Sequence, residues 1–132
     1  MNARNILTLV GVVLGLQGIA FVTMGAEITA EAFAAMAPGD TALAVGMMMH
    51  EVLGMMSLMV ASILLFSRNL EPSAGARVLM GTGVGLGLVL LHAVYNLLET
   101  NAKPPIPVLV VMDVLMALSF VTAKTEAGSG GA

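Results

Sequence analysis

The feature of this sequence that most constrains its fold is a set of four long apolar runs. They extend over residues 6–26, 42–66, 78–98 and 106–123. At ~1.5 Å per residue, helices of these lengths reach ~27 to 37 Å, which is enough to cross the hydrocarbon core of a bilayer. Polar residues do not alternate with apolar ones within the runs, so strands are not favoured. The runs predict an all-α fold, a four-helix transmembrane bundle.

The composition supports this prediction. The chain is 58% hydrophobic and 10% charged, more apolar than a soluble domain of this size tolerates. The first run is longer than the ~7 to 15 apolar residues of a cleavable signal, so we interpret it as an uncleaved anchor. We predict one transmembrane domain over residues 1–126 and a flexible tail over 127–132, with the lipid bilayer as principal partner.

Charge and cysteine content narrow the possible functions. The net charge is −3 and the basic residues form no stripe, so nucleic acid is not an expected partner. The chain has no cysteine, which excludes disulfides, thiolate catalysis and cysteine-ligated metals. Arg4, Arg68, Arg77 and Lys124 lie at the two ends and in the middle turn. By the positive-inside rule we expect antiparallel spans with both termini in the cytoplasm.

The segments between the runs carry residues that start or stop helices. The first outward loop contains a helix-forming stretch at 29–36, and Asp40 or the following threonine can cap the second span. Pro72 and Gly75 are expected to interrupt the chain between the second and third spans, and the prolines at 104–105 do so before the fourth.

Small residues recur on the spans at the spacings that mark contacting helix faces in membranes. In lipid, helices associate through close van der Waals contact, which small residues permit. On the third span we expect Gly83 and Gly87 to lie behind the contacting face. An alternative role for such glycines is to leave clearance for a flat cofactor or a lipid tail. The glycines predicted to pack helices are Gly11, Gly15, Gly18, Gly46, Gly54, Gly81 and Gly85.

Six polar residues inside the spans form the candidate site. They are Gln17, His50, Glu51, His92, Asn96 and Asp113. An ionisable side chain in hydrocarbon costs ~2.5 to 3.5 kcal/mol, so each needs a partner or a purpose. We count residues from the outward end of each span to estimate depth. Gln17, His50, His92 and Asp113, one from each span, then lie ~9 to 14 Å below the outer boundary. We therefore expect one polar layer, with both histidines pointing inward and Asp113 paired to a histidine or to Asn96 across the bundle.

Three interpretations of this layer remain open. Hydrogen bonds among its members can fix helix register. The layer can instead form an outward pocket that relays protons or contacts a quinone or another small lipophile. Third, His50 and His92 can ligate haem or a metal, although no His-Glu-x-x-His motif is present and neighbouring helices lie close for a bis-histidine haem. The methionines at 47–59 also suggest a Cu(I) site, because thioethers can bind Cu(I). Consecutive methionines point around the helix, however, which favours a role in apolar packing.

The chain resembles small four-span bacterial membrane proteins of the DoxX-like type. The resemblance rests on Gly15-Leu16-Gln17-Gly18, on the proline-containing outward loop, and on Glu51-Val52-Leu53-Gly54 before the basic turn with Arg68. It implies a location in the bacterial cytoplasmic membrane and a non-catalytic role as a subunit beside quinone-linked or redox-stress enzymes. A further membrane subunit or a small lipophilic ligand would then be the partner. His50 and His92 match no motif of that family.

Overall fold

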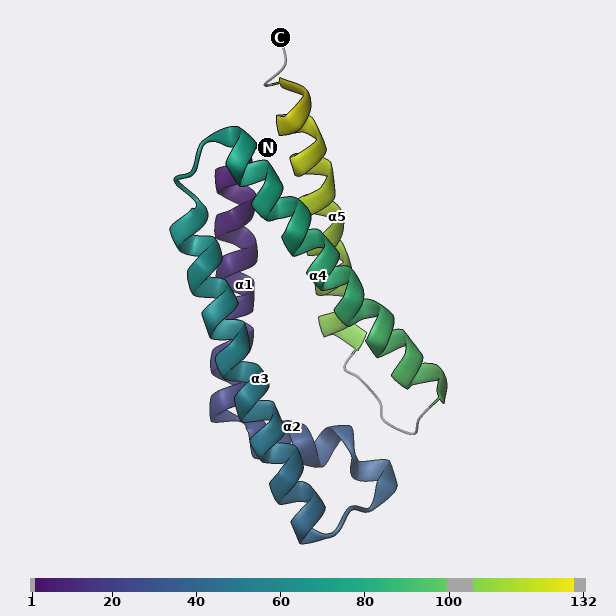
Figure 1. Ribbon diagram of the computed structural model, residues 1–132. Helices are drawn as coiled ribbons and strands as arrows, with labels where there is room; N and C mark the ends of the chain where they lie inside the picture. Colours follow the sequence, from purple (N-terminus) through teal and green to yellow (C-terminus); the bar gives the residue numbers. More distant parts are fainter. Residues whose placement is uncertain (1, 100–105, 130–132) are drawn as a thin grey trace.

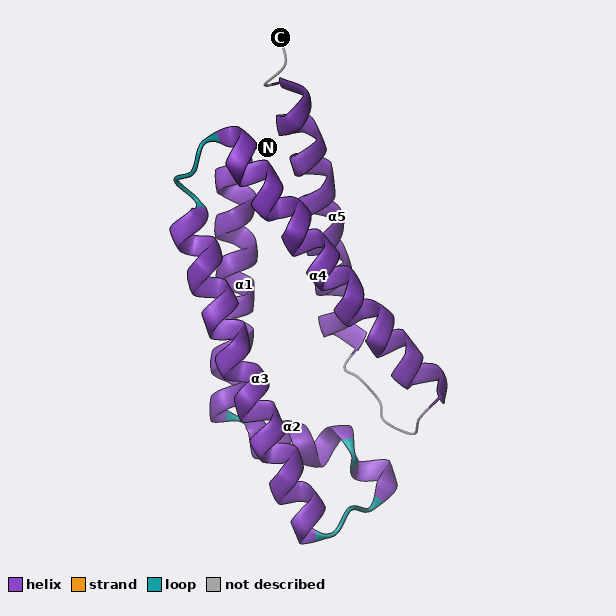
Figure 2. Ribbon diagram, in the orientation of Figure 1, coloured by secondary structure: helices purple, strands orange, loops and turns teal. Residues whose placement is uncertain are grey.

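The computed structural model of the chain describes residues 2–99 and 106–129, and these form helices without any strand (Figure 2). Four of the helices are long and apolar enough to cross a membrane, which confirms the number of predicted spans. They are α1 (Ala3–Thr23), α3 (Asp40–Ser67), α4 (Pro72–Glu99) and α5 (Ile106–Ser129). The short helix α2 (Gly25–Ala32) and the 3-10 helix η1 (Ala34–Met36) join α1 to α3.

The ends of the first two spans differ from the prediction in detail. α1 stops at Thr23 because Met24 leaves the helical conformation, with φ −122° and ψ 22°, and the chain bends before α2 begins. The helix expected at 29–36 therefore starts earlier and divides into α2 and η1. Asp40 is the first residue of α3 and Gly39 is its cap. A carboxylate in that first turn favours the helix through its dipole.

Pro72 begins a helix instead of stopping one. It is the first residue of α4, where the missing N–H leaves no hydrogen bond unmade. Gly75 therefore lies inside α4, and a Cβ there would stand 3.1 Å from the Cβ of Ala3. The prolines at 104–105 fall outside the described residues. α5 continues to Ser129, so the first part of the predicted 127–132 tail is helical, and 130–132 is likewise not described.

The long helices associate as two pairs, α1 with α3 and α4 with α5 (Figure 1). In the first pair Gly11 lies against Leu65, while Gly18 lies against Gly54. In the second pair Gly83 lies against Phe120, and Gly87 lies against Met116. Residue numbers thus rise along one helix of each pair as they fall along the other.

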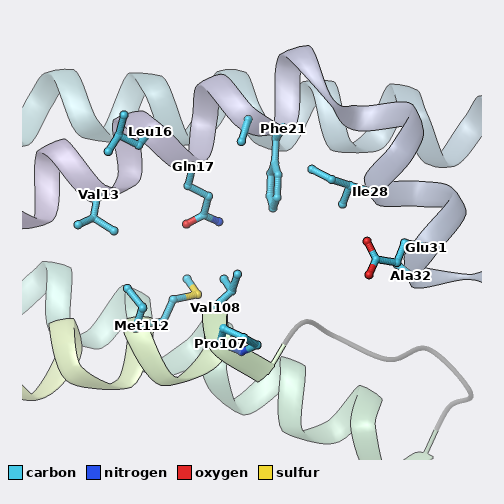
Figure 3. Close-up of a pocket in the computed structure, with 12 residues that line it drawn as sticks. Val13, Leu16, Gln17, Phe21, Ile28, Glu31, Ala32, Pro107, Val108 and Met112 are labelled. Atoms are coloured by element: carbon cyan, nitrogen blue, oxygen red, sulfur yellow. The ribbon is translucent and has the colours of Figure 1, made fainter.

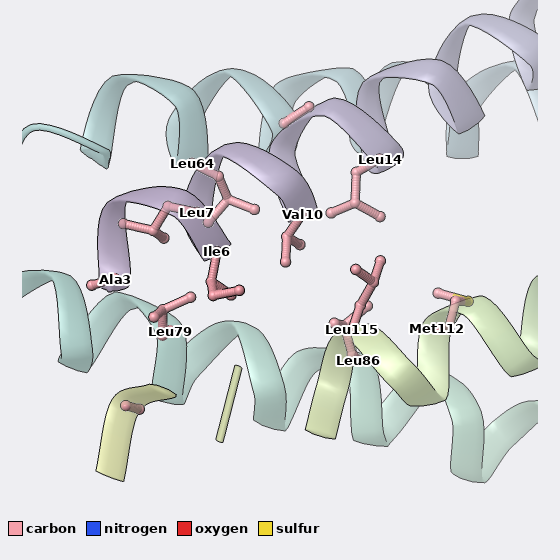
Figure 4. Close-up of a cluster of buried hydrophobic side chains, with 12 residues drawn as sticks. Ala3, Ile6, Leu7, Val10, Leu14, Leu64, Leu79, Leu86, Met112 and Leu115 are labelled. Carbon is pink, nitrogen blue, oxygen red and sulfur yellow. The ribbon is translucent and has the colours of Figure 1, made fainter. Parts of the chain in front are cut away.

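The two pairs meet at one end of the molecule and diverge toward the other (Figure 1). At the narrow end the backbone N–H of Ala3 donates a hydrogen bond to Glu126 Oε1 at 2.9 Å, which joins the start of α1 to the end of α5. The hydrophobic core occupies this half (Figure 4). Its buried members are Ala3, Ile6, Leu7, Val10, Leu14, Ala61, Leu64, Leu79, Leu86, Met112, Leu115 and Ala123.

Most of the helix surface faces outward. Within the most apolar window of each long helix, only 17 to 33% of residues are buried. Hydroxyl groups on these helices donate a hydrogen bond to the backbone carbonyl one turn earlier. They need such a partner because the hydrocarbon of a bilayer offers none. The donors are Thr8, Thr23, Ser62, Thr82 and Ser119. An apolar exterior with satisfied backbone and hydroxyl groups is that of a multi-pass membrane protein.

Candidate functional site: a cleft between the helix pairs

Two cavities lie where the helix pairs diverge. The first, of about 550 Å³, is lined by α1, α2 and α5. The second, of about 450 Å³, is lined by α1, α3, α4 and α5. Gln17, Phe21, Val108 and Met112 line both cavities. We call the two cavities together the interpair cleft.

The first cavity has apolar walls and two polar lining residues, Gln17 and Glu31. In Figure 3 the side chains of Gln17 and Phe21 point from α1 toward Val108 and Met112 on α5. Glu31 of α2 lies at the far end of the same cavity (Figure 3). Its carboxylate is exposed, whereas the Gln17 amide is half-buried. Among the described residues of this lining, the one charged side chain thus comes from helix α2.

The described residues that line the second cavity include no ionisable side chain. Its polar lining residues are Gln17, Ser57 and Thr82, and the Thr82 hydroxyl already donates to the carbonyl of Val78. Gly85 lies on the wall, where it narrows the cavity less than a larger residue would. The Gln17 amide offers two N–H donors and one carbonyl acceptor between apolar walls. Such a site can hold a lipophile and hydrogen-bond one polar group on it.

His50 lies on α3, outside the interpair cleft, and fastens α2 to its own helix. Its Nδ1 is 2.9 Å from Thr29 Oγ1 and 2.9 Å from the carbonyl oxygen of Gly46. A carbonyl only accepts, so Nδ1 donates its proton in the contact with Gly46. Thr29 is buried and its hydroxyl donates to the carbonyl of Gly25 at 2.6 Å. The edge of the imidazole meets the ring of Phe21, with centroids 5.5 Å apart.

Sequence reasoning missed Thr29, which is the partner of His50. The available signal was the spacing of four residues between Gly25, which the prediction placed at the end of the first span, and Thr29 in the first outward loop. Glu51, next to His50, is half-buried beside the bend between α1 and α2. A Cβ at Gly25 would lie 3.7 Å from its Cγ.

The structure does not assemble the predicted polar layer. His92 is exposed on α4 and stacks on Tyr95 of the same helix, with ring centroids 6.5 Å apart. Asp113 is exposed on α5, and Asn96 is half-buried on α4. The expected layer required the four helices to lie close together at this depth, but α3 and α4 diverge at this end (Figure 1). His50 lies on the α1/α3 pair and His92 on the α4/α5 pair, so the two histidines are separated.

This arrangement does not fit the proposed haem or metal site. Across residues 2–99 and 106–129, no group of three or more histidine, aspartate or glutamate side chains could hold a metal ion. The two histidines lie on diverging helices, and Nδ1 of His50 is engaged by Thr29 and Gly46. The methionines of α3 do not converge either, because all six are exposed around the helix. These are Met47, Met48, Met49, Met55, Met56 and Met59.

The predicted packing glycines of α1 and α3 contact neighbouring residues, whereas those of α4 do not. A Cβ at Gly46 would clash with the methyl group of Thr29, 2.5 Å away, and at the α1/α3 crossing a Cβ on Gly18 or on Gly54 would stand 2.8 Å from the carbonyl oxygen of the other. Gly81 and Gly85 were expected to pack, but nothing lies within 4 Å of a Cβ built on either. The stripe expected to lie behind them, Gly83 and Gly87, contacts α5 instead. The sequence carries both stripes and does not state which one faces the partner helix.

No family model, curated protein or solved structure matches this chain. The function is therefore inferred from the interpair cleft itself.

Proposed function

We propose that this chain is a small protein of the bacterial cytoplasmic membrane that binds one lipophilic molecule in the interpair cleft and catalyses no reaction itself. One observation carries the proposal. Apolar side chains from both helix pairs line the cleft, and Gln17 lines both of its cavities. Ligand sites combine an apolar wall with a few placed polar groups in this way.

In this proposal the four spans run antiparallel and both termini are cytoplasmic. Four of the five basic residues support the orientation: Arg4, Arg68, Arg77 and Lys124 all belong to the narrow end of the molecule. Basic residues next to spans are retained on the cytoplasmic side. The interpair cleft then opens in the outer half of the bilayer, beneath α2, and a ligand enters it sideways from the lipid.

We assign the ligand to the quinones or to similar molecules with a carbonyl-bearing ring and a hydrocarbon tail. Gln17 can donate an N–H to a ring carbonyl while the ring lies near Phe21. The volumes of about 550 and 450 Å³ accommodate a ring and a short isoprenoid segment. The resemblance to DoxX-like proteins supports a place beside a quinone-linked or redox enzyme, to which this chain would present the ligand as an accessory subunit.

Photolabelling tests the proposal. The purified chain, reconstituted in vesicles, is irradiated with an azidoquinone that carries a short isoprenoid tail, and the labelled residues are mapped by mass spectrometry. Val108→Trp fills both cavities, because Val108 lines each of them. The matched control is Val114→Trp, on the same helix at an exposed position that lines neither cavity. We expect labelling of cleft residues to fall at least about tenfold in Val108→Trp only.

Gln17→Leu separates a quinone from a plain lipid tail. Without the amide the quinone loses its hydrogen bond, so its labelling should fall while labelling by an azido-alkyl lipid is unchanged. Equal loss of both labels would indicate that Gln17 shapes the cleft without contacting a ring. Equal quinone labelling in Val108→Trp and Val114→Trp would reject the cleft as the binding site.

A further inference from the structure

One charged side chain of the interpair cleft has no role in the function proposed above. Of the residues described around the cleft, Glu31 alone carries a charge. It belongs to α2, and its exposed carboxylate lies at the far end of the first cavity (Figure 3). Glu31 makes no hydrogen bond or ion pair with any residue in 2–99 or 106–129. Its oxygens can therefore accept hydrogen bonds from a ligand.

Contacts with α3 hold α2 in one orientation. Thr29 of α2 is buried, and its Oγ1 lies 2.9 Å from Nδ1 of His50. Its methyl group lies so close to α3 that a Cβ at Gly46 would stand 2.5 Å from it. At ~100° per residue, Glu31 is ~200° from Thr29 around the axis of α2. Glu31 therefore faces away from α3 and toward the cavity, which it lines together with Ile28.

Gln17 and Glu31 lie on two sides of the same apolar space. In Figure 3 the side chains of Phe21 and Ile28 lie between them. A ring that packs on Phe21 and Ile28 therefore has the amide on one side and the carboxylate on the other. In a para-benzoquinone, and in the quinol formed from it by reduction, the two oxygens lie at opposite sides of the ring. One oxygen can then meet Gln17 while the other meets Glu31.

The two polar groups differ in the hydrogen bonds that they can make. The amide of Gln17 both donates and accepts, whereas the carboxylate of Glu31 only accepts. A quinone oxygen also only accepts, so it cannot bond to Glu31, and its lone pairs would face a negative charge. A quinol oxygen carries a hydrogen that it can donate. Hydrogen bonds to an ionised acceptor are roughly twice as strong as those between neutral groups.

We propose that the interpair cleft binds the reduced quinol in preference to the oxidised quinone, and that Glu31 determines this preference. The inference rests on the function proposed above, in which the cleft holds a ligand of this class. Gln17 serves either form, and Glu31 stabilises only the form whose oxygen carries a hydrogen. Thr29 and His50 are positioning residues, because they hold the helix that presents the carboxylate. Binding transfers no electron and no proton.

Direct binding of the two redox forms tests the inference. A tritiated benzoquinone with a short isoprenoid tail, or its quinol prepared by chemical reduction without oxygen, is added at neutral pH to phosphatidylcholine vesicles with and without the full chain. We expect the native protein to bind the quinol at least about fivefold more tightly than the quinone. In Glu31→Gln the amide can donate as well as accept, so the two affinities should agree within about twofold. The matched control is Glu27→Gln, which removes an exposed carboxylate from the same helix that lines neither cavity, and it should keep the native ratio.

A second pair of variants tests the positioning by α3. Thr29→Val weakens the attachment of α2 without removing the carboxylate, so the ratio of the two affinities should fall by about twofold or more, whereas Thr29→Ser should keep it. Equal affinities in the native protein, or a native ratio in Glu31→Gln, would overturn the inference and leave the cleft as a binding site. If neither form binds, the proposed function fails and this inference fails with it.

Discussion

Replacing Gly18 by alanine tests how closely α1 and α3 approach. The new Cβ would lie 2.8 Å from the carbonyl oxygen of Gly54 and 3.0 Å from the backbone N of Leu58. It would also lie 2.8 Å from Leu58 Cγ. A side chain can rotate away, but two of these three atoms belong to the backbone of α3. The helices must therefore separate by several tenths of an ångström, and contacts along the whole α1/α3 pair weaken.

The matched control is Gly15→Ala, in the same helix and at the same interface. Its Cβ meets Ala61 Cβ at 3.7 Å, an ordinary contact. Both variants gain the same helix propensity, up to ~1 kcal/mol, so their difference isolates the cost of the clash. Overpacking of this kind costs ~1 to 3 kcal/mol. We expect the free energy of unfolding of Gly18→Ala to be lower than that of Gly15→Ala by ~1 to 3 kcal/mol.

The assay is unfolding in mixed micelles with a rising fraction of dodecyl sulfate. Energy transfer between dyes on cysteines introduced near the start of α1 and the end of α3 reports separation of the pair. Gly15→Ala should unfold at the native fraction of dodecyl sulfate or above it, and Gly18→Ala clearly below. If both variants unfold together, the α1/α3 crossing is not as close as the structure shows.

Three further predictions concern other contacts. Thr29→Val removes the hydroxyl that binds His50, so we expect a loss of ~0.5 to 1.5 kcal/mol and faster hydrogen exchange in α2, whereas Thr29→Ser should retain both. In Gly83→Ala the Cβ meets the Phe120 ring at 3.0 Å, and because a ring can shift, the same titration should give a smaller loss than Gly18→Ala. For topology, an impermeant maleimide applied to spheroplasts should label Met36→Cys from outside, and Ser73→Cys should react only after the membrane is opened; the reverse pattern would invert the proposed orientation.

The number of spans could be predicted because it depends only on the length and hydropathy of each run. The local effect of Pro72 could not, since a proline that ends one helix also suits the first position of the next. Likewise, both faces of α4 carry two glycines, so the sequence does not distinguish them. Only the position of α5 determines that Gly83 contacts it and Gly81 does not.

The candidate site was predictable in part. Gln17 was identified as a polar residue in a span, and it lines both cavities. The shared layer of His50, His92 and Asp113 was not formed, because residue counting gives depth within one helix but not the angle between helix pairs. The hydrogen bond between His50 and Thr29 depends on the bend of the chain at Met24. The pattern of apolar residues does not predict that bend.

The helix pairs contact each other mainly at the narrow end (Figure 1). A rotation of one pair about that end therefore changes the distance between the pairs at the other end. With 28 residues, α3 is ~42 Å long at 1.5 Å per residue. A rotation of only ~5° about the narrow end then displaces its outer end by ~4 Å, by simple leverage along a rigid helix. Small repacking around Ile6 and Leu79 is thereby amplified into a large change in the width of the outer opening.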